Sequence, residues 1–202
     1  MSDMTTPDLL KLVEELFLPF HQIKRNHRLP RGPWRHETDV EHSWIVGVLA
    51  CSMAPHIDPQ LELGKISQYA SVHDLVEVYA GDTSLFTSSA KHHASKAERE
   101  QASLARIRQE HPAFPWIADT IAEYESFASD EAKYVYAVDK YIALMYDLID
   151  EGRTLIKHGV THERYEIVRT EHRRKAHLDP RVGKYYDEIL AIIHEHPEYF
   201  AR

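Results

Sequence analysis

The chain has 202 residues, of which 43% are hydrophobic and 28% are charged, a balance that is typical of one globular domain and excludes a disordered chain. Its net charge of −8 argues against binding of nucleic acid polymers, which normally requires a basic surface. We find no apolar run of about 18 residues and no signal-peptide pattern, so we expect a cytoplasmic protein without a membrane partner.

The first part of the chain combines one helix with an irregular basic segment. Pro7 suits the first turn of a helix, and apolar residues at helical spacing extend this helix to about Phe20. Over residues 21–40 a regular helix is excluded by Pro30, Gly32 and Pro33. The same segment gathers the arginines Arg25, Arg28, Arg31 and Arg35. It is either a solvated connecting loop or a wall of a site at which arginine binds phosphate in a bidentate manner.

Two longer helices are expected next. The apolar run that begins after His42 predicts a helix over about residues 40–54. Asp58 and Pro59 then predict the cap and the first turn of a third helix, which extends to Tyr79.

The third helix carries a group of ionisable residues on a largely apolar background. His73 and Asp74 are adjacent, and Glu77 lies one turn farther along. Adjacent helical residues point about 100° apart, so both reach one ion only if it lies against that flank of the helix. Three ionisable groups on one face are costly to bury without partners. A bound cation would remove that cost, and the alternative is a solvated or capped His–Asp pair.

The rest of the chain also reads as helices joined by polar loops. We expect a polar loop over residues 81–94 and a helix that ends near Glu110, with Ser95 and Glu98 as its capping box. Further helices are expected over residues 115–124, 130–151, 161–176 and 180–196. Because no strand-like alternation of useful length is present, the expected fold class is all-α.

One acidic residue stands alone in a strongly apolar helical run. Asp139 is surrounded by Val, Ile, Leu and Tyr over residues 134–145, and a carboxylate in such a helix needs a partner. Together with His42, His73 and Asp74, it offers two imidazoles and two carboxylates. This set suits a borderline metal such as Zn, Mn, Co or Fe.

The order of these residues, H…HD…D, resembles the HD-domain metal-dependent phosphohydrolases, and within them the branch that contains the bacterial 5′-deoxynucleotidases. The likeness rests on the Arg-rich approach to Glu41-His42-Ser43, on the H-D-x-x-E…G-D run from His73 to Asp82, and on Asp139. These segments span roughly residues 23–145. The resemblance implies a single domain over residues 1–202, a bundle of about six to eight helices with the metal site between central helices. Helices within residues 155–202 would pack on it.

The resemblance also assigns roles to individual residues. One divalent ion (Mn, Co, Zn, Fe or Mg) would be held by His42, His73, Asp74 and Asp139. Glu77 would act as general acid or base, and Asp82 would orient the attacking water or accept its proton, although the two roles could be exchanged. The alternatives are that Glu77 supports a ligand imidazole and that Asp82 is a turn residue after Gly81.

The substrate phosphate would be held by Arg28, Lys91 and Lys96, and the alternative for each lysine is a solvated helix face. In the deoxynucleotidase branch, an arginine followed by an aromatic residue contacts the substrate and helps to reject ribose. Arg28 fits the arginine position, but Leu29 stands where the aromatic residue would be. Trp34 could replace that aromatic ring from another direction.

The activity implied is a divalent-metal-dependent phosphohydrolase that removes the 5′-phosphate from (deoxy)nucleoside monophosphates to give nucleoside and phosphate. One alternative is a deoxynucleoside triphosphate phosphohydrolase, which the positive charge around residues 25–35 and 91–99 supports. The other is a non-catalytic metal- or nucleotide-binding module, against which the complete ligand set argues. The expected partner is a small nucleotide, and relatives in this branch are often dimers, which implies a homodimer.

Other histidines give no clear site from their spacing. His158 and His162 are four residues apart, but Gly159 and Val160 make a helix there doubtful. His194 is two residues from His196, so the two point to different faces of a helix. We expect these histidines to lie on the surface, like the adjacent pair at residues 92–93.

Overall fold

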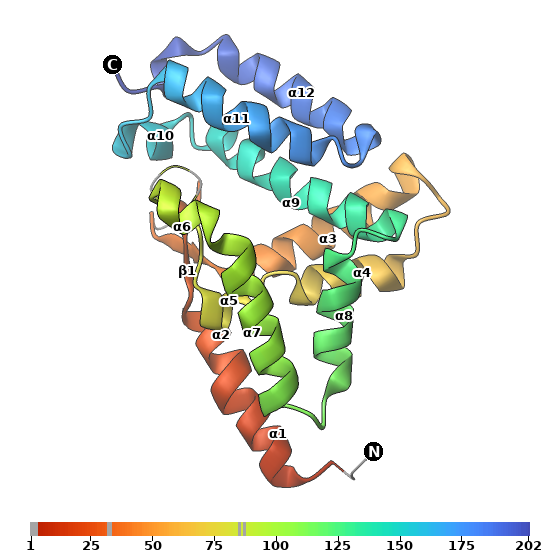
Figure 1. The fold of residues 1–202 in the computed structure, drawn as a ribbon. Helices are drawn as coiled ribbons and strands as arrows, with labels where there is room; N and C mark the ends of the chain where they lie inside the picture. The colour runs from red at the N-terminus through yellow and green to blue at the C-terminus, as the bar shows by residue number, and fades with distance from the viewer. Residues whose placement is uncertain (1–3, 32–33, 85, 87) are drawn as a thin grey trace.

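The computed structural model describes residues 4–31, 34–84, 86 and 88–202, so the helix-breaking Gly32 and Pro33 lie outside the described residues. Figure 1 shows helices α9, α11 and α12 side by side at one end of the molecule. Helices α3 and α4 cross beneath α9, and α7 and α8 extend toward the N-terminal helix at the opposite end. The site described below lies where α3, the α4–α5 connection and α9 meet.

The described helices and strands have the following bounds: α1 (Thr6–Leu12), a π-helical turn (Val13–Phe17), α2 (Leu18–Gln22), β1 (Lys24–Arg28), β2 (His36–Thr38), α3 (Asp39–Ile57), α4 (Leu63–Val72), α5 (Glu77–Ala80), α6 (Ala90–Ala94), α7 (Lys96–Glu110), α8 (Pro115–Glu125), α9 (Asp130–Ile149), α10 (Arg153–Lys157), α11 (His162–Ala176), α12 (Pro180–His194) and a 3-10 turn (Pro197–Tyr199). Among the described residues, seven helices have ten residues or more: α3, α4, α7, α8, α9, α11 and α12. The all-α fold class is confirmed.

The N-terminal helical segment is longer than expected and is not uniform. It continues past Phe20 to Gln22, through a π-helical turn that precedes Pro19. Proline has no N–H to donate to the preceding turn, so the regular α-helical ladder cannot be maintained there.

Within the segment that was expected to be irregular, the structure forms two short strands. β1 and β2 pair antiparallel, with Lys24 opposite Thr38 and Arg28 opposite His36. The strands are short and polar, so they lack the apolar alternation by which a strand is recognised in a sequence. Side chains add to the pairing, since the ring of His36 contacts the Arg25 carbonyl at 2.7 Å through Nδ1. The hairpin positions Arg25 beside the central helices.

The third helix was expected to run unbroken to Tyr79, and this was wrong at both ends. Helix α4 begins at Leu63 and ends at Val72, and residues 73–76 form turns before α5 starts at Glu77. In this break the backbone hydrogen bonds join residues three apart instead of four, as in the bond of 2.8 Å from the Glu77 N–H to the Asp74 carbonyl. Because the backbone leaves α-helical geometry here, the separation of about 100° no longer restricts where two adjacent side chains point.

The capping box expected at Ser95 and Glu98 was also wrong. A short helix, α6, precedes α7 and is capped by Ser89, which accepts a hydrogen bond from the His92 N–H. Ser95 joins the two helices, and its hydroxyl donates to the His92 carbonyl at 3.2 Å instead of capping α7. The polar segment that was expected to be a loop is therefore partly helical.

Helix α9 is the centre of the packing, because it contacts α3, α4, α11 and α12. One face of α9 carries Asp147, which is buried. Its carboxylate accepts hydrogen bonds from Arg169 and, at 3.0 Å, from the Tyr165 hydroxyl. Arg169 is only 1% exposed, so this ion pair lies within the core between α9 and α11.

We expect Asp147→Ala to lower the free energy of unfolding by about 3–5 kcal/mol, since it leaves the Arg169 charge buried without its partner. Denaturant unfolding followed by circular dichroism measures the change. Glu171→Ala removes an exposed carboxylate from the same helix pair and should change little. Equal unfolding midpoints for the two variants would contradict the role of the buried pair.

Candidate metal centre

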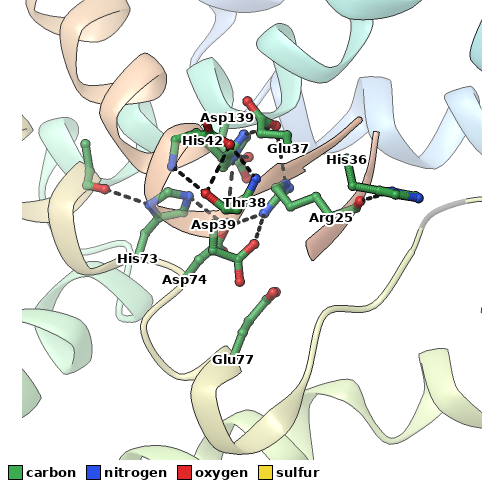
Figure 2. A network of polar contacts seen from close by, with 12 residues as sticks. Arg25, His36, Glu37, Thr38, Asp39, His42, His73, Asp74, Glu77 and Asp139 are labelled. Atoms are coloured by element: carbon green, nitrogen blue, oxygen red, sulfur yellow. Dashed lines mark hydrogen bonds and ion pairs between the residues drawn. The ribbon is translucent and has the colours of Figure 1, made fainter. Parts of the chain in front are cut away.

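Four of the sequence-predicted residues converge on one point. His42 Nε2 lies 2.9 Å from Asp139 Oδ1 and 3.9 Å from Asp74 Oδ2, and His73 Nε2 lies 3.2 Å from Asp74 Oδ2. Ligand atoms of His42, His73 and Asp139 all fall within 4.8 Å of one another. Figure 2 shows these side chains pointing toward one another from α3, from the break after α4 and from α9.

A capping box fixes the start of the helix that presents His42. The Thr38 hydroxyl accepts from the Glu41 N–H at 3.3 Å, and the Glu41 carboxylate accepts from the Thr38 N–H at 3.0 Å. Arg35 holds the same carboxylate with both of its terminal nitrogens. The T-x-x-E pattern of these residues is a standard helix-start signal, so this feature could have been found in the sequence.

The second nitrogen of each histidine is already engaged, which orients the two rings. His73 Nδ1 donates to the Ala70 carbonyl at 2.9 Å. His42 Nδ1 lies 3.4 Å from Glu37, a fully buried carboxylate that accepts a hydrogen bond from Tyr146 at 2.7 Å. Such outer partners are usual for metal-binding imidazoles. In this structure Glu37 and the Ala70 carbonyl, and not Glu77, contact the Nδ1 atoms of the two imidazoles.

The donor set fits a divalent metal ion. His73 Nε2 is buried and makes no hydrogen bond, although Asp74 Oδ2 is only 3.2 Å away. A buried imidazole nitrogen without a partner is costly unless something accepts its lone pair. Two imidazoles and two carboxylates are also the ligands that zinc, manganese, cobalt and iron prefer.

The charges at this centre favour ionised carboxylates. Burial would raise the pKa of Asp74, but His73 and Arg25 hold it well below the usual range. Lys140 and His42 do the same for the pKa of Asp139. Burial and the nearby Arg25 would lower the pKa of His42, but the Asp139 and Glu37 carboxylates outweigh them and raise it to about 9. The acidic groups therefore attract positive charge to this point.

A group of three carboxylates adjoins the point where the four predicted ligands meet. Carboxylate oxygens of Asp39, Asp74 and Glu77 lie within 4.8 Å of one another. The Arg25 guanidinium stands among them, 2.5 Å from Asp74 and 3.5 Å from Asp39. Burial, together with the Asp74 charge, raises the pKa of Asp39 to about 7. Sequence reasoning assigned no role to Asp39, and it placed Arg25 in a basic segment that is either a solvated loop or a wall of a phosphate site, because only the fold brings the two residues to this point.

Glu77 faces the same space from the first turn of α5. Its side chain is buried, its Oε2 makes no hydrogen bond, and Lys96 Nζ lies 3.6 Å from its other oxygen. Burial, and then the Asp74 charge, raises the pKa of Glu77 well above its usual range. A carboxyl group in this state is suited to give a proton to a leaving oxygen.

A cavity of about 130 Å³ opens beside the centre, and several of the predicted residues line it. Glu77, Asp82 and Lys96 do so, together with Arg25 and Asp139. The other two predicted phosphate contacts lie outside this lining. Arg28 donates to the Trp34 carbonyl at 2.7 Å and its guanidinium stacks 4.6 Å from the Trp34 ring centroid, while Lys91 is exposed on α6.

Comparison with known proteins points to one family. The HD domain matches residues 20–179, which cover most of the chain. The crystal structure of a predicted metal-dependent phosphohydrolase from Magnetospirillum magnetotacticum MS-1 superposes with a TM-score of 0.77 and 25% sequence identity. This similarity covers 97% of the present chain and 95% of the other. The comparison with curated proteins gives no match.

Proposed function

The chain belongs to the HD-domain family, and we propose that it is a divalent-metal-dependent phosphohydrolase that removes the 5′-phosphate from (deoxy)nucleoside monophosphates. The observation that carries this proposal is the convergence of His42, His73, Asp74 and Asp139. The two aspartates line a cavity whose wall also includes the cationic side chains of Arg25 and Lys96. The similarity to a predicted metal-dependent phosphohydrolase supports the same reaction class.

The four converging residues would hold the ion through two imidazole nitrogens and two carboxylates. A divalent ion supplies Lewis acidity, which activates water near neutral pH and neutralises charge on a phosphoryl group. Glu37 and the Ala70 carbonyl keep the two imidazoles in the orientation that this binding requires.

Proton transfer falls to the acidic residues that line the cavity. Glu77 is one turn beyond the Asp74 ligand, so it can reach a leaving oxygen at the same phosphorus. Asp82 lines the cavity from the segment after Gly81 and can accept a proton from the attacking water. General acid–base catalysis of this kind contributes roughly 10²–10⁴-fold to a rate.

Phosphate binding falls to Arg25 and Lys96, which reach the cavity from β1 and α7. Arginine binds two phosphate oxygens at once through its planar guanidinium, and lysine acts as a point charge. The cavity of about 130 Å³ is smaller than the roughly 300 Å³ at which ligand pockets usually begin. It therefore suits the phosphate end of a nucleotide, with the nucleoside nearer the surface.

A second candidate is a deoxynucleoside triphosphate phosphohydrolase, and one observation favours it. Lys96, Lys140 and Lys175 reach the same cavity from α7, α9 and α11. Burial, together with the charges of Lys140 and Lys96, lowers the pKa of Lys175, as expected where like charges line one cavity. A chain of phosphates would relieve that repulsion better than one phosphate does.

The two functions release different products, so an assay separates them. We expect orthophosphate from deoxynucleoside monophosphates in the presence of added Mn²⁺, Co²⁺, Mg²⁺ or Zn²⁺, and little product from triphosphates. Tripolyphosphate release from triphosphates as the main reaction would favour the second candidate. Tight binding of nucleotide and metal without turnover would contradict both and leave a binding module.

We also propose that the protein forms a homodimer. A groove of about 540 Å³ lies between α2, α3 and α8, and Trp44 and Trp116 on its sides are 68% and 51% exposed. Exposed apolar surface of this kind commonly marks a protein–protein contact.

No helix in the described part of the chain is both long and apolar enough to cross a lipid bilayer.

A further inference from the structure

We propose that His162, Glu166 and His194 form a second divalent-metal site, separate from the cavity described above. His162 is the first residue of α11, Glu166 follows one turn later, and His194 is the last residue of α12. One ligand atom from each lies within 4.8 Å of the other two. The group joins two helices that are consecutive in the chain and pack against each other.

The separations of the ligand atoms suit a single small ion. Glu166 Oε1 lies 2.5 Å from His194 Nε2 and 3.7 Å from His162 Nε2. Tetrahedral zinc with bonds of about 2.0–2.1 Å places its ligand atoms roughly 3.3 Å apart. The observed distances lie on either side of this value, so rotations of half-exposed side chains are enough to reach it.

The contact between Glu166 and His194 is not an ordinary hydrogen bond. Glu166 Oε1 is shielded from solvent and accepts no hydrogen bond, although a histidine nitrogen is only 2.5 Å away. The ring nitrogen is therefore not directed at the oxygen. An imidazole nitrogen and a carboxylate oxygen held this close without a hydrogen bond can both donate lone pairs to one cation. At the first centre it is the histidine nitrogen, His73 Nε2, that makes no hydrogen bond, 3.2 Å from Asp74 Oδ2.

The donor types indicate which ions fit. Two imidazoles and one carboxylate suit Zn²⁺, Co²⁺, Ni²⁺ or Cu²⁺, whereas Mg²⁺ and Ca²⁺ prefer sites built from oxygen alone. Three protein ligands leave a position for water, which the exposure of His162 and His194 permits. Phe200 packs edge-on against the His162 ring, with 4.8 Å between the ring centroids.

An ion at this site would connect the start of α11 to the end of α12. The first turn of α11 also contacts a residue that lines the cavity beside the first centre. Tyr165 stacks on Phe86 at 6.0 Å, and Arg164 donates to the Phe86 carbonyl. Phe86 in turn lines that cavity. The site is therefore suited to a structural role that stiffens this part of the molecule, without contact with the substrate.

Zinc stoichiometry tests the proposal. We would strip the full-length protein of metal and titrate Zn²⁺ by calorimetry, using wild type, the double variant His162→Gln/His194→Gln and the control His196→Gln. His196 also pairs with a carboxylate, Glu198, close to the same helix end, but it is not part of the group. We expect the double variant to bind one equivalent fewer than wild type, and the control to bind the same number as wild type.

This difference does not depend on how the catalytic centre behaves. If that centre binds no zinc, wild type should still bind one equivalent and the double variant none. The thermal midpoint of wild type should rise with Zn²⁺ by more than that of the double variant. Equal stoichiometry for wild type and double variant, with equal thermal shifts, would overturn the proposal. Phosphohydrolase activity should be retained in the double variant, which leaves the proposed function to its own test.

Discussion

Replacement of Asp74 by alanine is expected to lower kcat/KM by about 10³-fold or more, because it removes one of two carboxylates at the metal centre. Asp74 Oδ2 lies 3.9 Å from His42 Nε2 and 3.2 Å from His73 Nε2, so it can share one ion with both imidazoles. The variant should also bind the divalent ion more weakly. Initial rates over a range of metal concentrations measure both effects.

The Asp74→Ala protein should remain folded. Asp74 belongs to a group of carboxylates that repel one another, and Arg25 keeps Asp39 and Glu37 as partners when Asp74 is removed. Asp119→Ala, an exposed acid on α8, is the matched control and should leave activity unchanged. Near wild-type turnover by a folded Asp74→Ala protein, at limiting metal, would show that this centre is not the catalytic one.

Glu77→Gln is expected to lower kcat by about 10²–10⁴-fold while leaving metal stoichiometry unchanged. Glutamine keeps the size of the side chain and its place beside Lys96, but it cannot transfer a proton. Because the histidines are already supported by Glu37 and the Ala70 carbonyl, loss of Glu77 should not disturb the ligands.

Asp82→Asn, measured in parallel, separates the two acidic residues. If Glu77 is the principal acid, its substitution should have the larger effect on kcat for a substrate with a poor leaving group. The opposite order would exchange their roles. Unchanged kcat in both variants would contradict proton transfer by either residue and would require a different group on the cavity wall.

The sequence allowed the fold class and the convergence of four candidate metal ligands to be predicted, for a definite reason. Ionisable residues such as Asp139 stand out in apolar helical runs because they cannot be buried alone. Their convergence then follows from the need to share a partner, and the resemblance to HD-domain proteins gave the order in which they occur. The structure brings His42, His73, Asp74 and Asp139 together at one point.

Features that depend on the path of the backbone could not be predicted in the same way. The break after Val72 replaces α-helical bonds with tighter ones in a stretch whose pattern is fully helical. The β1–β2 hairpin is polar and short, and it places Arg25, rather than Arg28, beside the acidic groups. A shift of three residues along a strand moves a side chain to the other face, so the choice between two arginines required the register.

The second histidine group shows the same limit for contacts between helices. Judged by spacing along the chain, His162 would pair with His158, and His194 with His196. The structure instead pairs His162 with His194 across α11 and α12, together with Glu166. Residues 32 positions apart carry no periodic signal that they meet, because their proximity arises only when the two helices pack antiparallel.

The central claim, that this chain is a metal-dependent phosphohydrolase, is tested most directly by chelation and metal replacement. Protein treated with EDTA would be assayed for orthophosphate release from deoxynucleoside monophosphates before and after addition of Mn²⁺, Co²⁺, Mg²⁺ or Zn²⁺. We expect no turnover after chelation and restored turnover with at least one of these ions. Turnover that persists in the fully metal-free protein, or no turnover with any ion despite stoichiometric binding, would contradict the claim.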